Sequence, residues 1–132
     1  MKFGCTLIYV EDVIKTIEFY QNAFGFERSF VYEDNGVALY AELKTGETAI
    51  GFSSFILGEM NFKGNYQKIS NNGSPVGLEL VFFDNNVESA TNKAVDFGAR
   101  LIESPHKKPW GQTVSFIRSI EGTLIEICSP MQ

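Results

Sequence analysis

The stretch TLIYVEDVIKTIEFYQNAFG, residues 6–25, determines the fold that this sequence predicts. Its first five residues, Thr6–Val10, are mostly apolar and β-branched, which favours a β-strand. One apolar stripe then recurs at helical spacing: Val13, Ile17, Tyr20 and Phe24. Asp12 can cap the first N–H groups of this helix, and Gly25 can end it in the left-handed conformation. The stretch therefore predicts a strand followed by an amphipathic helix.

Three strand-like runs follow the helix and complete a β-α-β-β-β unit. These runs are Glu27–Glu33, Val37–Leu43 and Thr48–Ser53. The segments between them, Asp34-Asn35-Gly36 and Thr45-Gly46-Glu47, are typical of hairpin turns because glycine tolerates a positive φ.

The second half of the chain repeats this order of elements. Strands are predicted at Leu78–Phe83, Leu101–Glu103, Thr113–Arg118 and Thr123–Cys128, with a turn at Glu121-Gly122. The helix is predicted from the stripe Val87, Ala90, Ala94 and Phe97, with Asn86 as its cap and Gly98 as its terminator. The first helical valine recurs after 74 residues, the terminating glycine after 73 and the glycine of the last turn after 76. This agreement indicates an internal repeat.

The 132 residues are expected to form one domain built from two modules. Module one spans 1–57, module two spans 74–132, and the polar, Gly- and Asn-rich segment 58–73 is the connector between them. With 44% hydrophobic residues the chain can form a core without a metal or a disulfide. The predicted fold class is α+β.

The charge balance restricts the partners of the protein. The formal net charge is −5, which argues against nucleic acid and anionic membrane, since both require clustered positive charge. Neither a signal peptide nor a membrane-spanning run is recognised in the sequence. Two cysteines are too few for a disulfide framework and are expected to be reduced. We therefore expect a cytoplasmic protein.

Two groups of residues carry a resemblance to a known family. Residues 10–13, 18–20 and 24–26 follow the pattern V-x-D-…-F-Y-…-L-G-F. Residues 109–112 and 119–127 follow W-G-…-D-P-D-G-N-x-I-E, with Ser-Ile-Glu in place of Asp-Pro-Asp. The sequence thus resembles the vicinal oxygen chelate superfamily of glyoxalases, bleomycin-resistance proteins and extradiol dioxygenases, and most of all its metal-lacking bleomycin-resistance-like members. The resemblance implies two tandem modules whose curled mixed sheets form a cleft.

The resemblance also implies where a metal would be bound. Metal-binding members place four ligands, usually His and Glu, on the first and fourth strands of the two modules. Carried over to this chain, the four positions are Cys5, Gly51, Glu79 and Glu126. One is glycine and none is histidine, while the sole histidine, His106, lies in the expected polar loop Glu103–Lys108. We therefore expect no metal cofactor; a divalent metal, if bound, would be held by Glu79, Glu126 and Cys5.

Glu79 and Glu126 are the strongest candidates for ligand binding because each is a carboxylate in an otherwise apolar strand. Burying a carboxylate without a partner costs free energy. One interpretation is a polar anchor in a ligand cleft with a raised pKa. The other is a structural ion pair, for instance with Arg118 or Arg28, or exposure at a sheet edge. The sequence leaves both open.

Aromatic residues and one cysteine supply the remaining candidates. Trp110 can stack on a planar ligand, or it can cover the core where its loop enters a strand. Most strand aromatics are expected in the core, but Tyr40, Phe52 and Phe116 are assigned to the ligand-binding face. Cys5 is a further candidate contact, with an inert thiol as the alternative because no histidine is near enough in the pattern to activate it. No catalytic residue is identified.

Two hypotheses of function follow. The preferred one is a metal-independent protein that binds, and sequesters, a polar or cationic small organic molecule. The alternative is a divergent metal-dependent lyase, isomerase or dioxygenase that uses Glu79 and Glu126. A homodimer is expected in either case, because two open sheets would leave unpaired edges in a small monomer.

Overall fold

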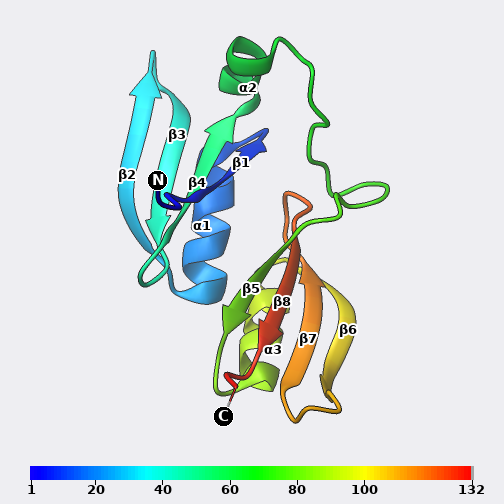
Figure 1. Cartoon of the computed structure of the whole chain (residues 1–132). Helices are drawn as coiled ribbons and strands as arrows, with labels where there is room; N and C mark the ends of the chain where they lie inside the picture. Colours follow the sequence, from blue (N-terminus) through cyan, green and yellow to red (C-terminus); the bar gives the residue numbers. More distant parts are fainter. Residues whose placement is uncertain (132) are drawn as a thin grey trace. The chain divides into compact units, whose positions relative to one another are not determined.

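The computed structural model describes residues 1–131 and divides the chain into two compact units, Met1–Lys68 and Ile69–Gln132. The boundary between the units falls inside the expected connector. Figure 1 shows that each unit contains its own sheet and its own long helix, which lies against one face of that sheet.

The first unit contains the β-α-β-β-β order and one additional helix. Its elements are β1 (Thr6–Val10), α1 (Val13–Phe24), β2 (Glu27–Asp34), β3 (Val37–Lys44), β4 (Ala49–Ser54) and α2 (Phe55–Phe62). The strands lie in the order β1-β4-β3-β2, with β1 parallel to β4 and the other pairs antiparallel. The sheet is therefore mixed, as the repeat predicts.

The second unit has the same topology. Its elements are β5 (Glu79–Phe83), α3 (Val87–Asp96), β6 (Arg100–Lys107), β7 (Thr113–Arg118) and β8 (Leu124–Cys128). The strands lie in the order β5-β8-β7-β6, with β5 parallel to β8 and the remaining pairs antiparallel. The predicted fold class, α+β with two tandem modules of mixed sheets, is confirmed.

Local chemistry explains where the long helices begin and end. The Asp12 carboxylate accepts a hydrogen bond from the Lys15 N–H at 3.0 Å, and the Asn86 side chain accepts from the Ser89 N–H at the same distance. Gly25 ends α1 with a φ of 74°, in the left-handed region that glycine enters at little cost. These caps confirm the predicted start of both helices and the predicted end of α1. α3, in contrast, ends at Asp96, with Phe97 rather than the predicted Gly98 as its C-cap.

Each core lies between a helix and one face of its sheet. In the first unit Tyr20 of α1 packs on Phe52 of β4, with ring centroids 4.8 Å apart and both side chains fully buried. In the second unit the Thr91 hydroxyl of α3 lies 2.6 Å from the Ser115 hydroxyl of β7. Because side chains alternate along a strand, the neighbours of Phe52 and Ser115 point to the opposite face.

The structure corrects the sequence prediction at two places. Segment 58–73 was expected to be a connector and no helix was predicted there, but α2 extends through Phe62. The expected polar loop Glu103–Lys108 is mostly strand, because β6 continues to Lys107. β6 is an edge strand with two register shifts, and this irregular pairing accommodates Pro105, which cannot donate a ladder hydrogen bond.

Arg118 fixes the second half of the connector to the second unit. Its guanidinium donates to the carbonyls of Gly122 at 3.1 Å, Gly73 at 2.8 Å and Ser70 at 2.7 Å. The side chain is only 6% exposed, so these charge-assisted bonds satisfy a buried cation. Residues 70–73 therefore belong structurally to the second unit.

Across residues 1–131, no helix has the length and apolar character needed to cross a membrane.

Candidate functional site

The face of the second sheet that points away from α3 carries most of the candidate residues. We call it the open face of the second unit and define it by Glu79, Val81, Phe83, Phe116 and Glu126. Strand pairing places Glu126 opposite Phe116 on one side and opposite Val81 on the other. The face is largely apolar and accessible, since Val81 is 46% and Phe83 is 67% exposed. The two carboxyl groups therefore lie within an apolar surface.

Glu79 and Glu126, predicted separately from two strands, form a carboxyl pair. The Glu79 carboxyl lies within hydrogen-bonding reach of Glu126. Partial desolvation, this hydrogen bond and the repulsion from Glu126 together raise the pKa of Glu79. A protonated Glu79 can donate to the Glu126 carboxylate, so the pair can hold one shared proton.

The pair has no cationic partner within residues 1–131. The Arg118 guanidinium is occupied by three backbone carbonyls, and the Arg28 guanidinium donates to the Gln21 side chain at 3.2 Å. The structural ion pair considered as an alternative is therefore absent from the described part of the chain. A pair of carboxyl groups on an apolar face without a counter-ion can accept an external cation.

The Lys108 and His106 side chains lie close to the Phe116 ring. The Lys108 ammonium lies 5.6 Å from the centre of the Phe116 ring, and the His106 ring centre lies 6.3 Å from it. The imidazole Nδ1 is 2.8 Å from the Ser104 carbonyl. Because a carbonyl can only accept, Nδ1 carries a proton and Nε2 is left for another partner. The sequence analysis missed both residues because it placed them in a solvated loop.

Trp110 lies in the turn that joins β6 to β7. Its indole is 61% exposed, and the indole N–H donates to the Gln112 side-chain oxygen at 2.8 Å. The Gln112 amide in turn donates to the Ser129 carbonyl at 2.7 Å. The ring is thus held at one end and accessible over most of its surface. Trp110 is not fully packed against the core, and its stacking on a planar ligand stays a prediction.

The corresponding face of the first sheet has different chemistry. We define the open face of the first unit by Leu7, Tyr9, Tyr40, Glu42 and Gly51. The Tyr40 hydroxyl donates to the Glu42 carboxylate at 2.7 Å. A Cβ at Gly51 would lie 2.8 Å from that hydroxyl oxygen and 3.2 Å from two ring carbons. The Tyr40 side chain therefore occupies the space that a residue larger than glycine would need at position 51.

Burial and the bond to Glu42 raise the pKa of the Tyr40 phenol. Glu42 was not identified from the sequence, although strand alternation places it directly opposite Gly51. Phe52, by contrast, was assigned to the ligand-binding face, and this assignment is wrong. It lies in the core against α1, because its neighbour Gly51 is on the open face and side chains alternate along β4.

The two cysteines have different environments. Cys5 is partly exposed just before β1, and Cys128 is buried at the end of β8. Burial, with further contributions from Glu126 and Glu79, raises the pKa of the Cys128 thiol. A raised pKa keeps this thiol protonated, and protonated thiols neither attack electrophiles nor bind metals well.

The donor set of the second unit does not fit a metal site. No three His, Cys, Asp or Glu side chains within residues 1–131 lie close enough together to hold a metal ion. The two carboxyl groups of Glu79 and Glu126 are joined by no histidine, and the nearby Cys128 thiol is protonated. Metals of the first transition row are usually bound by three or four such donors.

An aromatic cluster that the sequence analysis missed lies at one end of the first open face. The rings of Tyr9, Phe62 and Tyr66 are 5.5–5.8 Å apart. The Tyr66 ring packs onto the backbone of Gly58 in α2, and its hydroxyl is buried without a hydrogen-bond partner within residues 1–131. The Asn61 amide donates to the Tyr9 hydroxyl at 3.0 Å. α2 thus covers part of β1 through this cluster.

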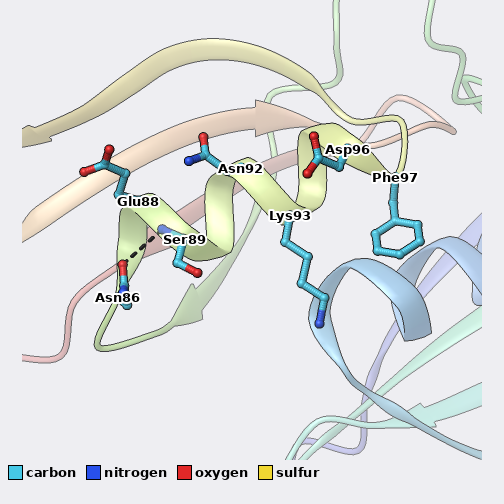
Figure 2. A pocket seen from close by; sticks show the side chains of 7 residues that line it. All are labelled: Asn86, Glu88, Ser89, Asn92, Lys93, Asp96 and Phe97. Carbon is cyan, nitrogen blue, oxygen red and sulfur yellow. Dashed lines mark hydrogen bonds between the residues drawn. The ribbon is translucent and has the colours of Figure 1, made fainter.

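A hollow of roughly 570 Å³ lies along α3. Figure 2 shows its lining residues, which come from α3 and its two ends: Asn86, Glu88, Ser89, Asn92, Lys93, Asp96 and Phe97. The dashed line marks the helix cap, in which the Ser89 N–H donates to Asn86. None of the residues predicted for the site lines this hollow. It is a polar helix surface, and the candidate site lies on the other face of the sheet.

Solved structures share this fold at low sequence identity. A glyoxalase/bleomycin resistance protein/dioxygenase family enzyme from Burkholderia phytofirmans PsJN superposes with a TM-score of 0.82, at 21% identity over 96% of each chain. TioX from Micromonospora sp. ML1 has a TM-score of 0.73, at 19% identity over 98% of each chain. A glyoxalase-related enzyme from Fulvimarina pelagi has a TM-score of 0.75, at 14% identity over 98% of this chain and 88% of its own.

Sequence comparison identifies the family. The comparison with curated proteins gives no match. The glyoxalase-like domain family, however, matches residues 3–132, which is almost the whole chain. The tandem β-α-β-β-β topology and the structural neighbours agree with this match. The chain therefore belongs to the glyoxalase-like domain family.

Proposed function

We propose that the protein binds a small organic cation without a metal and that it sequesters this molecule rather than converting it. The observation that carries the proposal is the Glu79–Glu126 carboxyl pair, which has no counter-ion within residues 1–131 and lies on an accessible apolar face. Fold alone does not define function in this family, so the proposal rests on these side chains.

The physical argument concerns charge and desolvation. A carboxylate on an apolar surface is poorly solvated, which is one reason why the pKa of Glu79 is raised. An ammonium or amidinium group placed between the two carboxyl groups would replace the shared proton and restore full ionisation. The apolar part of the same molecule would bury Val81, Phe83 and Phe116, which adds hydrophobic stabilisation.

The experiment compares a cation with its neutral isostere. We would titrate 4-methylbenzylamine and 4-methylbenzyl alcohol into the ¹⁵N-labelled protein at pH 7 and low salt, and measure Kd from NMR shift changes. The amine is expected to bind about tenfold more tightly than the alcohol, because a charge-assisted hydrogen bond is worth about 1.5 kcal/mol or more. Recovery of the amine unchanged, verified by mass spectrometry, is expected for sequestration.

Matched variants locate the binding. Glu126→Gln should reduce the preference for the amine to less than about twofold, since it removes one of the two negative charges. Glu88→Gln removes the same charge from α3, on the other face of the sheet, and should leave the preference unchanged. Equal affinity for amine and alcohol in the unaltered protein would contradict the proposal.

The carboxyl pair also favours a second candidate, the metal-dependent lyase, isomerase or dioxygenase. Two adjacent carboxylates are good ligands for Mn²⁺ or Fe²⁺, although no third donor joins them in the described chain. The test is the melting temperature with added Mn²⁺, Fe²⁺, Co²⁺, Ni²⁺ or Zn²⁺. A rise of several degrees that disappears in Glu126→Gln would support this candidate over the first.

A further inference from the structure

We propose that the open face of the second unit recognises a zwitterionic small molecule, with its cationic group at Glu79 and Glu126 and its anionic group at Lys108, beside His106. This inference rests on the proposed function and specifies its ligand class. Phe116 lies between the two charged ends and supports the apolar middle of the molecule.

The order of the strands separates the two charges. Glu79 is on β5 and Glu126 on β8, Phe116 is on β7, and His106 is on β6, in the sheet order β5-β8-β7-β6. Neighbouring strands are about 4.8 Å apart, so β8 and β6 are separated by roughly 10 Å. A molecule that contacts both ends therefore needs its two charges on opposite sides of a spacer about as long as one aromatic ring.

The backbone of Lys108 is held in place where the anionic group of the proposed ligand would bind. Its backbone N–H donates to the Gln112 carbonyl at 2.8 Å, and its carbonyl accepts from the Gly111 N–H at 2.9 Å. Its side chain lies over the Phe116 ring and is half-buried, yet it forms no ion pair within residues 1–131. A partly desolvated ammonium on an aromatic face is stabilised by a cation–π contact but can still accept an anionic partner.

His106 adds a second group at this end. Its Nδ1 is used by the Ser104 carbonyl, and its ring contacts Phe116. The lone pair of Nε2 would accept from a donor group of the bound molecule. The face therefore combines the Glu79–Glu126 carboxyl pair with the Lys108 ammonium at the Phe116 ring, and this arrangement is complementary to a zwitterion rather than to a simple cation. The exposed Glu103 of β6 also lies beside Phe116, directly opposite it in the strand register.

The test extends the ligand series used for the proposed function. The probes are 4-(aminomethyl)benzoate, which carries both charges, 4-methylbenzylamine, which lacks the carboxylate, and 4-methylbenzoate, which lacks the ammonium. The zwitterion is expected to bind about five- to tenfold more tightly than the amine, allowing for solvent screening at a half-buried lysine. The NMR titration gives all three Kd values under one set of conditions.

Two neighbouring lysines provide a matched pair of variants. Lys108→Met should abolish the gain from the carboxylate while leaving the affinity for 4-methylbenzylamine within about twofold. Lys107→Met removes the same charge one residue earlier, from an exposed position of β6, and should retain the gain. Both substitutions keep an unbranched side chain, and a second variant, Lys108→Gln, serves if Lys108→Met does not fold.

The outcomes separate the inference from the proposed function. If the amine binds and the zwitterion binds no more tightly, the inference is wrong and the proposed function stands. If 4-methylbenzoate binds as tightly as the zwitterion, or if the gain persists in Lys108→Met, the inference is also wrong. Failure of the amine to bind more tightly than its alcohol would overturn the proposed function and the inference together.

Discussion

The two open faces of the molecule have the same strand topology but satisfy their polar groups in different ways. On the first, the Glu42 carboxylate receives a hydrogen bond from Tyr40, whose ring fills the space above Gly51. On the second, the positions equivalent to Tyr40 and Gly51 are Val114 and Glu126, 74 and 75 residues later. Neither position carries a hydroxyl group, and within residues 1–131 the Glu126 side chain has the Glu79 carboxyl as its hydrogen-bonding neighbour.

This difference is the basis on which we propose the second face, and not the first, as the ligand-binding face. The polar groups of the first face are paired with each other, so binding another molecule would have to replace a hydrogen bond of 2.7 Å. On the second face, the Glu79 and Glu126 carboxyl groups repel each other when both are ionised, and an external cation can relieve this repulsion. The repeated topology thus carries a tyrosine–carboxylate hydrogen bond on the first face and a carboxyl pair on the second.

The largest expected effect comes from placing the second-face residue on the first face. Gly51→Glu should lower the free energy of unfolding by roughly 3 kcal/mol, because its Cβ would collide with Tyr40 and its carboxylate would lie opposite Glu42. Urea denaturation followed by circular dichroism measures the change.

The double variant Tyr40→Val/Gly51→Glu copies the arrangement of the second face. It should recover about 1–2 kcal/mol of the loss, since the two positions are in contact and their effects are not additive. Tyr40→Val alone is the control for the loss of the ring. A stable Gly51→Glu variant would show that Tyr40 does not occupy this space.

A smaller effect is expected from Tyr40→Phe, which removes only the hydrogen bond to Glu42. The expected loss is about 1 kcal/mol at pH 7, the usual net contribution of such a bond. Folding raises the pKa of the Tyr40 phenol. The phenol therefore makes its full contribution to the free energy of unfolding below the ordinary phenol pKa of about 10, and this contribution is lost as the pH rises further. The wild-type advantage should therefore shrink in alkali. As a control, Tyr32→Phe at an exposed tyrosine should change neither the free energy of unfolding at pH 7 nor its decline at alkaline pH.

The smallest effect concerns the second face. The pKa of Glu79 is raised in the folded protein. The Glu79 side chain therefore makes its full contribution to the free energy of unfolding below the ordinary glutamate pKa of about 4.3, and this contribution declines as the pH rises above that value. Glu79→Gln should therefore be more stable than the wild type at pH 7, by less than about 1 kcal/mol because the side chain is exposed. The difference should vanish near pH 4. Parallel pH profiles of unfolding for the two proteins would contradict the carboxyl pair.

Most of the fold could be predicted because its signals are local. The apolar stripe of α1, the cap Asp12 and the terminator Gly25 all follow from short-range chemistry, and their recurrence identified the second module. The family resemblance likewise placed Glu79 and Glu126 at equivalent ligand positions on two strands. It could not show that the two carboxyl groups meet, which depends on the parallel pairing of β5 with β8.

The parts that were missed depend on tertiary contacts. α2 has no apolar stripe, and its one buried residue is Gly58, covered by the Tyr66 ring. Pro105 marks β6 as a loop in sequence, whereas an irregular edge strand tolerates it. The contacts of Tyr40 and Lys108 depend on the small residue or the ring beneath each of them, and a single sequence does not specify such neighbours.

The burial of Cys128 has a practical consequence for labelling. Thiol-reactive reagents modify accessible thiolates, so a maleimide dye should attach to the partly exposed Cys5 and leave the buried Cys128 unmodified. Trp110 is the sole tryptophan and is largely exposed. The unaltered chain therefore carries a natural fluorescence donor in its second unit and a single attachment point for an acceptor in its first. Energy transfer between them would report the distance between the two units in solution, with and without ligand.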